Sequence, residues 1–321
     1  MKKNIITIGG GTGSFVLLAS LKKNYSQISA IVSMSDSGGS TGKLRKDWHV
    51  LPPGDIRQCL LALSNSNQTI NKLLSYRYAK GELKGHNFGN ILLSTLELVT
   101  GDFQKAIQEV SKILNINNKV IPIVLSPVNL VAVLKNKKKI TSEHLICEAN
   151  LGNLKSMKLE PETKANPEAI LAIKKASKII INPGGFFTSI IPIFLAKGLA
   201  EEIRKSKSKI IYICNIANNS LHIKNFTVVD YIEELEKYLG KDVINHVIYN
   251  KINQKNKTLE KYLHKGEDFV TPGDVKKYPK IKFIAQDLIN YKLYKQLNGD
   301  AIKRTLVRHD GDKLAKIIKK I

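Results

Sequence analysis

The amino-acid sequence predicts an α/β fold in which helices cover a mainly parallel β-sheet. Short runs of apolar, often β-branched residues, such as Ile5–Ile8, Ile28–Met34 and Ile179–Ile181, indicate buried strands. Segments with the length of helices alternate with these runs, a rhythm that is typical of βαβ units. Glycine-rich loops follow several of the strands directly. Because ligands bind at the carboxyl ends of strands in open α/β sheets, we expect these loops to form the functional site.

The first unit places a glycine loop between a strand and a helix. Gly9–Gly13 follows the strand Ile5–Ile8, and the segment Phe15–Leu21 has the composition of a helix. Backbone N–H groups and the positive end of the helix dipole then meet at one point, which favours an anion and most often a phosphate. The loop is not a dinucleotide fingerprint, because Gly13 follows Gly11 by two positions instead of three.

A second glycine loop follows the next strand and begins at Asp36. Gly38 and Gly42 are separated by three residues instead of the four of a P-loop, and Leu44 stands where that motif has a Ser or Thr. Two such loops after adjacent parallel strands would face one crevice and predict a nucleotide-type site. The alternative is that both are tight turns without a ligand. Asp36 would hold a ribose hydroxyl or cap the following turn.

Two further segments add polar groups to this crevice. Asp55 follows two prolines and a glycine, and we expect it to be the N-cap of the helix Ile56–Leu63. Arg57 opposes the dipole of that helix, which suggests contact with a phosphate or with an acidic neighbour, unless it is simply solvated. The loop Gly85–Asn90 precedes another apolar helix, and its His86 is placed for acid/base work or a phosphate contact, unless it is structural.

The middle of the chain departs from the βα rhythm and then returns to it. Val120–Leu125 and Val128–Leu134 read as strands with a turn at 136–139, which favours a hairpin outside the main sheet, and residues 145–166 look irregular. A fourth glycine loop, Asn182–Ser189, follows the strand Ile179–Ile181. The βα alternation then continues to Tyr249.

Composition limits the classes of function. The 321 residues carry a net charge of +24, which would suit nucleic acid, but only six of the 51 basic residues are arginine and the lysines are scattered. No nucleic-acid-binding signature is present, so we predict no nucleic-acid partner. The three cysteines match no metal or disulfide spacing. No apolar run is long enough for a membrane span and no signal peptide is evident, so we expect a cytoplasmic protein.

The assembled motifs resemble the YvcK/CofD-like family, and its YvcK branch in particular. The segments that carry the resemblance are Gly9–Gly13, Asp36–Arg45, Leu51–Leu60, Gly85–Asn90, Pro183–Gly185 with Thr188 and Ser189, Tyr212–Asn215, and Arg308–Asp310. The resemblance implies a Rossmann-like, three-layer α/β/α fold with a mainly parallel sheet and a β-hairpin excursion. It also implies a single domain over residues 1–321, with a core over about 1–250 and an extension over 251–321 packed on that core.

The resemblance further implies a nucleotide-diphosphate site, with Tyr262 and Arg308 at the base. The residues implied in nucleotide binding are Gly10, Gly11, Thr12, Gly13, Asp36, Gly38, Gly39, Ser40, Thr41, Arg45, Asp55, Asn90, Gly184, Gly185, Thr188, Tyr262 and Arg308. No catalytic residue and no resident metal is assigned. Ser37 stands where the family usually has Asp or Asn, and the loss of a second carboxylate beside Asp36 weakens a Mg²⁺ site.

Two functions follow from the resemblance, and the residues alone leave a third open. The first is a regulator that binds a UDP-sugar such as UDP-N-acetylglucosamine, is needed for cell shape and envelope homeostasis on gluconeogenic carbon sources, acts on a protein partner in envelope synthesis and is a homo-oligomer. The alternative is a CofD-like 2-phospho-L-lactate transferase acting on a deazaflavin coenzyme precursor, with Mg²⁺ near Asp36 and Asp55 and with His86 in proton transfer. An NAD(P) oxidoreductase is the third, without a catalytic dyad to support it.

Overall fold

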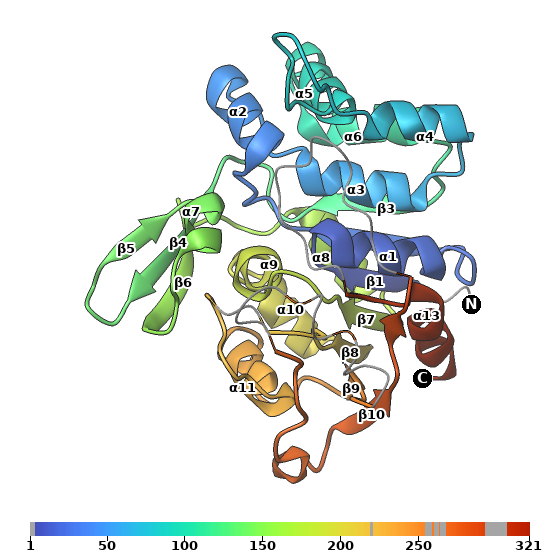
Figure 1. Cartoon of the computed structure of the whole chain (residues 1–321). Coiled ribbons are helices and arrows are strands. Elements are labelled where there is room, and N and C mark those ends of the chain that lie inside the picture. The colour runs from blue at the N-terminus through green and yellow to red at the C-terminus, as the bar shows by residue number, and fades with distance from the viewer. Residues whose placement is uncertain (1–3, 219–220, 254–258, 260–262, 264–267, 293–306) are drawn as a thin grey trace.

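The fold is that of a computed structural model of the whole chain (Figure 1). It describes residues 4–218, 221–253, 259, 263, 268–292 and 307–321. Within these residues no helix has both the length and the apolar character needed to cross a membrane.

A seven-stranded sheet forms the centre of the molecule, and all of its neighbouring strands run parallel. This confirms the predicted α/β class. In spatial order the strands are β10 (Lys282–Gln286), β9 (His246–Asn250), β8 (Lys209–Ile213), β7 (Lys178–Ile181), β1 (Ile5–Ile8), β2 (Ile28–Val32) and β3 (Lys119–Pro122). Every residue of β1, β2 and β7 is buried, as expected for strands covered on both faces.

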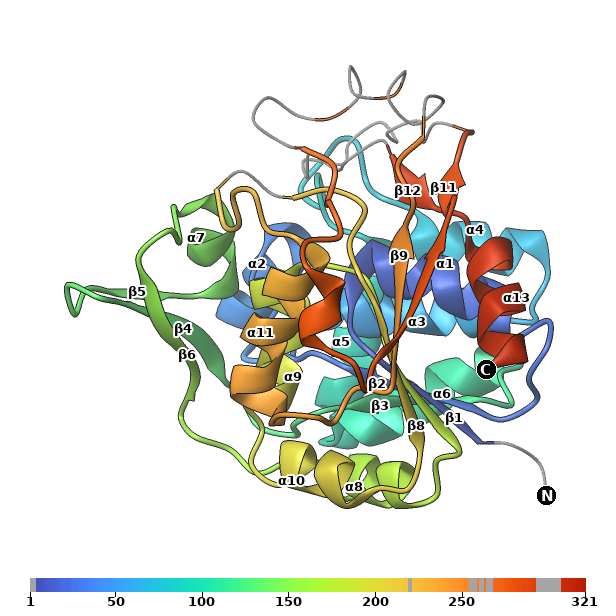
Figure 2. The ribbon, with the colours of Figure 1, turned by 90° about the horizontal axis from the view of Figure 1, so that it is seen from below.

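Helices pack on both faces of this sheet and give the Rossmann-like layers (Figures 1 and 2). The chain moves from β1 to β2 in one direction but from β7 to β8 in the other, and right-handed crossovers then place the two sets of helices on opposite faces. One set comprises α1 (Gly11–Leu21), α3 (Gly54–Leu63) and α13 (Gly311–Lys320). The other comprises α8 (Pro167–Lys174), α10 (Leu199–Lys205) and α11 (Val228–Leu239).

Further described helices lie in the connections between the strands of the sheet. They are α2 (Gly39–Trp48), α4 (Gln68–Ser75), α5 (Phe88–Thr100), α6 (Phe103–Ile113) and α9 (Ile191–Phe194). Asn166 caps α8 through its side chain, which accepts a hydrogen bond from the N–H of Glu168 at 2.9 Å, as the Asn-Pro pair predicts.

The antiparallel excursion is larger than the predicted hairpin. The strand β4 (Asn129–Leu134) pairs with β5 (Lys139–Thr141) and also with β6 (Leu154–Glu160), and α7 (Glu143–Glu148) lies beside them. A hairpin outside the main sheet is therefore confirmed, but it joins β4 to β5 and not the two strands from which we predicted it. The segment from Val120 instead belongs to the main sheet as β3, and residues 145–166 are not irregular. Only Met157 and Leu159 of β6 are buried, and the register shifts near its start, so the alternation that would reveal a strand is short.

The final segment is attached to the core through a buried histidine. His309 ends the short strand β12 (Arg308–His309), which pairs with β11 (Ile289–Asn290) just before α13. Its Nε2 lies 3.2 Å from the carbonyl oxygen of Cys214, and since a carbonyl only accepts, Nε2 carries the proton. Burial lowers the pKa of His309 to about 4, so the ring is neutral at neutral pH.

This buried histidine makes stability depend on pH. In the unfolded chain His309 titrates near 6.5, so the unfolded state binds a proton that the folded state refuses until about pH 4. We expect this one group to lower the free energy of unfolding by ~2 kcal/mol between pH 7 and pH 4.5. The variant His309→Gln keeps an N–H donor but does not titrate. Urea unfolding at both pH values should show the advantage of wild type over this variant shrinking by that amount, and a pH-independent difference would contradict the assignment.

Candidate functional site

The site lies where the order of the sheet changes direction, between β1 and β7. In doubly wound sheets this switch point opens a crevice at the carboxyl ends of the strands. The loops after the two strands approach each other backbone to backbone. A Cβ added to Gly13 would lie 2.0 Å from the carbonyl oxygen of Pro183, so no other residue fits there without moving a loop. The first and fourth predicted glycine loops are therefore direct neighbours.

Hydrogen bonds fix the first loop beside its neighbour. Asn182 Nδ2 donates to Ser14 Oγ at 2.9 Å, and Ser14 Oγ donates to the carbonyl oxygen of Gly10 at 3.1 Å. Gly11 has a φ of 65°, in the left-handed region that glycine adopts without strain. Gly10 is the N-cap of α1 and has no side chain of its own with which to cap the first turn.

The second loop is arranged around the carboxylate of Asp36. Its Oδ1 accepts a hydrogen bond from the N–H of Gly38 at 3.0 Å, which is the turn cap that the sequence left as one alternative. Arg45 donates to the main-chain oxygens of Asp36 and Val128, at 2.8 Å each, and so joins this loop to the excursion. A Cβ on Gly54 would lie 2.5 Å from Asp36 Oδ2, which places the start of α3 directly against this carboxylate.

The start of α3 also reaches the first loop. Asp55 is not the N-cap that we expected, because the helix begins at Gly54 and Pro53, with its ring-restricted φ of −83°, takes the cap position. The Asp55 carboxylate instead packs against the first loop. A Cβ added to Gly10 would lie 2.1 Å from Asp55 Oδ2. Arg57 Nε donates to Asn90 Oδ1 at 2.7 Å, and its charge helps to lower the pKa of Asp36 against the effect of burial.

The third loop holds the second one in place. Ser40 Oγ accepts a hydrogen bond from the N–H of Asn87 at 3.2 Å and lies 3.4 Å from His86 Nδ1. Ser40, Thr41 and Asn90 are all buried. Burial, with help from nearby Lys43 and Arg77, lowers the pKa of His86, so the ring is mainly neutral at neutral pH.

The helices at the crevice differ from the other long helices in how they begin. Among the described α-helices of at least eight residues, α1, α2 and α3 have no side-chain cap. A side chain caps each of α4, α5, α6, α8, α11 and α13. A helix N-terminus presents N–H groups and a positive dipole end, so three helix starts close together at a switch point favour an anion there.

A cavity of ≈ 470 Å³ opens beside these N-termini. The predicted residues that line it are Thr12, Gly13, Gly184, Gly185, Thr188 and Arg308. The other described members of the predicted set lie outside its lining. Around the starts of α1, α2 and α3 are Gly10, Gly11, Asp36, Gly38, Gly39, Ser40, Thr41 and Asp55, whereas Arg45 is in the last turn of α2 and Asn90 is at the start of α5. Tyr262 lies outside the described residues.

The cavity has walls that the sequence did not assign to binding. Asn215 exchanges two hydrogen bonds with Gly184, at 3.1 and 2.9 Å, and so fixes the fourth loop to the end of β8. Cys147 and His222 also line the cavity. His222 Nε2 lies 2.8 Å from the carbonyl oxygen of Ile146 at the end of α7, which brings the excursion over the crevice. No local pattern marks these residues, because they come from separate segments of the chain.

A second carboxylate faces Asp36 from the excursion. Glu143 Oε2 lies 3.5 Å from the N–H of Ser37, and Glu143 Oε1 accepts a hydrogen bond from the Cys147 thiol at 2.9 Å. Burial raises the pKa of Glu143, and the charge of Asp36 raises it further. Burial likewise raises the pKa of Asp36. Ser37 brings no carboxylate to the side of Asp36. Glu143, from a distant part of the sequence, supplies one instead.

Comparisons with known proteins cover nearly the whole chain. It is 40% identical to "Putative gluconeogenesis factor" of Aquifex aeolicus over 331 residues, which span 100% of this chain and 97% of that protein. It is 33% identical to the gluconeogenesis factor of Bacillus subtilis, over 99% of this chain and 97% of that one. A crystal structure of a UPF0052 family member from Bacillus halodurans superposes with a TM-score of 0.90 at 32% identity, covering 99% of both chains.

The family model described as 2-phospho-L-lactate transferase CofD matches residues 5–289. That range begins with β1 and includes every described glycine loop and α7. With the full-length similarities, this match shows that the chain belongs to the CofD family, and that its relatives there include proteins named gluconeogenesis factor.

Proposed function

We propose that the protein is a non-catalytic regulator that binds a UDP-sugar, such as UDP-N-acetylglucosamine, in the crevice between β1 and β7. The observation that carries the proposal is a cavity of ≈ 470 Å³ that the N-terminus of α1 lines, with the starts of α2 and α3 held close by through Asp36 and Asp55. A diphosphate is the anion that such backbone N–H groups bind well. The cavity is large enough for the nucleoside and sugar that flank the diphosphate.

Each part of the ligand has a partner in this proposal. The diphosphate lies against the N-terminus of α1 and the loop at Gly184, which touch the cavity. Asp36 is an acceptor for a hydroxyl group. Arg308 lines the far wall and is placed to stack on, or bond to, the base. The excursion contributes Cys147 and, through His222, the opposite wall.

The proposed regulation requires two conformations with different affinities for the ligand. The excursion is the element best placed to respond, because it reaches the crevice through Glu143 and Ser37 while its β-strands lie outside the main sheet. A protein partner in envelope synthesis would sense this shift and link UDP-sugar supply to cell shape. The relatives' name, gluconeogenesis factor, agrees with a role in adapting to carbon source.

Replacing Arg308 should weaken binding of UDP-N-acetylglucosamine. Arg308→Ala removes the cationic contact with the base, and we expect the dissociation constant from calorimetry to rise about tenfold or more. Arg308→Lys keeps the charge but not the planar guanidinium and should lie between the two. Arg204→Ala, on α10 away from the cavity, is the control of equal charge change. Equal affinity in wild type and Arg308→Ala would contradict the proposed base contact.

Replacing Gly13 should abolish binding by separating the two loops. The Cβ of Gly13→Ala would lie 2.0 Å from the Pro183 carbonyl oxygen, so one loop must move and the N-terminus of α1 shifts with it. In a thermal-shift experiment we expect UDP-N-acetylglucosamine to raise the melting temperature of wild type but not of Gly13→Ala. Gly152→Ala, at an exposed position of the excursion, should respond like wild type. A full ligand shift in Gly13→Ala would show that the diphosphate lies elsewhere.

A transferase of the phospholactate type is the second candidate, and the facing carboxylates Asp36 and Glu143 favour it. Mg²⁺ is usually held by one or two carboxylates together with substrate phosphates, so these two side chains fit such an ion. The metal would supply charge neutralisation at the transferred phosphoryl group. The described residues bring together no group of three or more His, Cys, Asp or Glu side chains suited to a metal without substrate.

Magnesium dependence separates the two functions. For the regulator we expect a thermal shift with UDP-N-acetylglucosamine that is unchanged by EDTA, and unchanged UDP-sugar after long incubation. For the transferase we expect a Mg²⁺-dependent shift with GDP and a deazaflavin. Glu143→Gln should remove that shift because it removes one charge from the metal site. This second pattern would overturn the regulator.

A further inference from the structure

A second concave surface lies away from the crevice, on the face of the sheet that α13 covers. It encloses ≈ 430 Å³ between α13 and the strands β8, β9 and β10. We call it the lysine pocket. The basic residues that line it are Lys209, His246, Lys282, Lys313, Lys316 and Lys320.

The strand register and the helix period bring these side chains together. Lys209, His246 and Lys282 are the first residues of β8, β9 and β10. His246 pairs with Lys282 on one side and with Ile211, two residues after Lys209, on the other, so all three side chains are on one face of the sheet. Along α13, Lys313, Lys316 and Lys320 are spaced by three and four residues and form one stripe.

Little negative charge offsets these lysines. No Asp or Glu is among the described residues that line the pocket. Lys209 Nζ donates to the main-chain oxygen of Ile321 at 2.6 Å, and Lys313 lies 3.8 Å from Asp287. No Asp or Glu side chain on the wall offsets Lys282 or Lys320, and the carboxylate that interacts with Lys316, that of Asp312, lies outside the lining.

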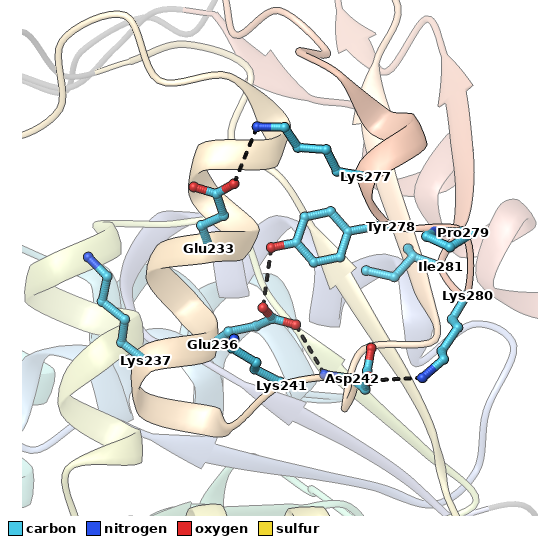
Figure 3. Close-up of a pocket in the computed structure, with 10 residues that line it drawn as sticks. All are labelled: Glu233, Glu236, Lys237, Lys241, Asp242, Lys277, Tyr278, Pro279, Lys280 and Ile281. Atoms are coloured by element: carbon cyan, nitrogen blue, oxygen red, sulfur yellow. Dashed lines mark hydrogen bonds and ion pairs between the residues drawn. The ribbon is translucent and has the colours of Figure 1, made fainter.

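A neighbouring concavity shows that the basic composition of the chain does not force this arrangement. The pocket beside α11 also has several lysines, but acidic partners come with them (Figure 3). There Lys280 pairs with Asp242 at 2.9 Å and Lys277 with Glu233 at 4.0 Å. The lysine pocket is therefore unusual in its unmatched charge and not in its lysine content.

The pKa of His246 reflects the positive potential in the lysine pocket. Its Nδ1 is buried and has no hydrogen-bond partner among the described residues. Burial lowers the pKa of His246, and the charges of Lys209 and Lys282 lower it further, as expected where the local potential is positive. A bound anion would reduce the repulsion among the lysines.

We propose that the lysine pocket is a second ligand site, which binds a small molecule carrying two or more phosphate groups. Several lysines around one cavity provide more positive charge than a single phosphate needs, whereas a polyphosphate can contact several of them together. The enclosed shape favours a small ligand over nucleic acid, which needs an extended basic surface. This site is separate from the crevice, because the two cavities share no lining residue and Lys209, His246 and Lys282 begin their strands, whereas the crevice lies at the carboxyl ends.

Calorimetric titration with inorganic tripolyphosphate tests this site on the full chain. We expect binding to wild type and a dissociation constant at least ~10-fold higher in Lys282→Gln/Lys316→Gln, because two charge-assisted contacts are lost. The double variant Lys277→Gln/Lys280→Gln removes the same charge from the pocket of Figure 3 and should bind like wild type. Circular dichroism of both variants verifies that they are folded.

Three outcomes would overturn the proposal. Equal loss of tripolyphosphate binding in both double variants would mean that only the overall charge matters. Binding that neither variant changes would place the anion elsewhere, for example in the crevice. No binding of tripolyphosphate to wild type, together with binding of duplex DNA that Lys282→Gln/Lys316→Gln weakens, would show that the surface serves nucleic acid.

Discussion

The close approach of two backbones at the switch point is the constraint on which the rest of the site depends. Gly13 and Pro183 meet where a side chain would collide with a carbonyl oxygen, so the ends of β1 and β7 share one small volume. This contact positions the start of α1. The start of α3 is positioned in turn by the close packing of Asp55 against Gly10. The anion binding that we propose for the crevice would therefore depend on main-chain packing, because N–H groups at helix N-termini can hold a phosphate without a side chain.

The excursion completes what the sheet begins. Ser37 Oγ accepts a hydrogen bond from the N–H of His144 at 2.9 Å, so the residue that departs from the family pattern fastens the second glycine loop to α7. Glu143 on the same helix then provides the acidic group near Asp36. A change that looks like a loss in the sequence is accompanied in the structure by a new connection between two parts of the chain.

Much of the fold was predictable, and the limits of prediction have a physical cause. Buried parallel strands such as Ile5–Ile8 and the glycines that follow them are local signals, so the sequence predicted the sheet and its loops correctly. The strand β6 was missed because only two of its residues, Met157 and Leu159, are buried, which makes its alternation too short to stand out. The N-cap was placed two positions too late, at Asp55, because Pro53 can itself begin a helix. Glu143 and His222 could not be found from sequence, since only the folded excursion brings them to the crevice.

The bonds between Asn182, Ser14 and Gly10 have a further consequence for the energetics of recognition. They join protein atoms to one another, so the loops keep their arrangement whether or not a ligand is present. A ligand that enters does not have to order them, and little conformational entropy is lost at this part of the site. Differences in affinity among nucleotides should then be set mainly by the groups that differ, the base and the sugar. The end of the crevice that we propose for the diphosphate is therefore rigid. The walls around the base and the sugar would distinguish one nucleotide from another.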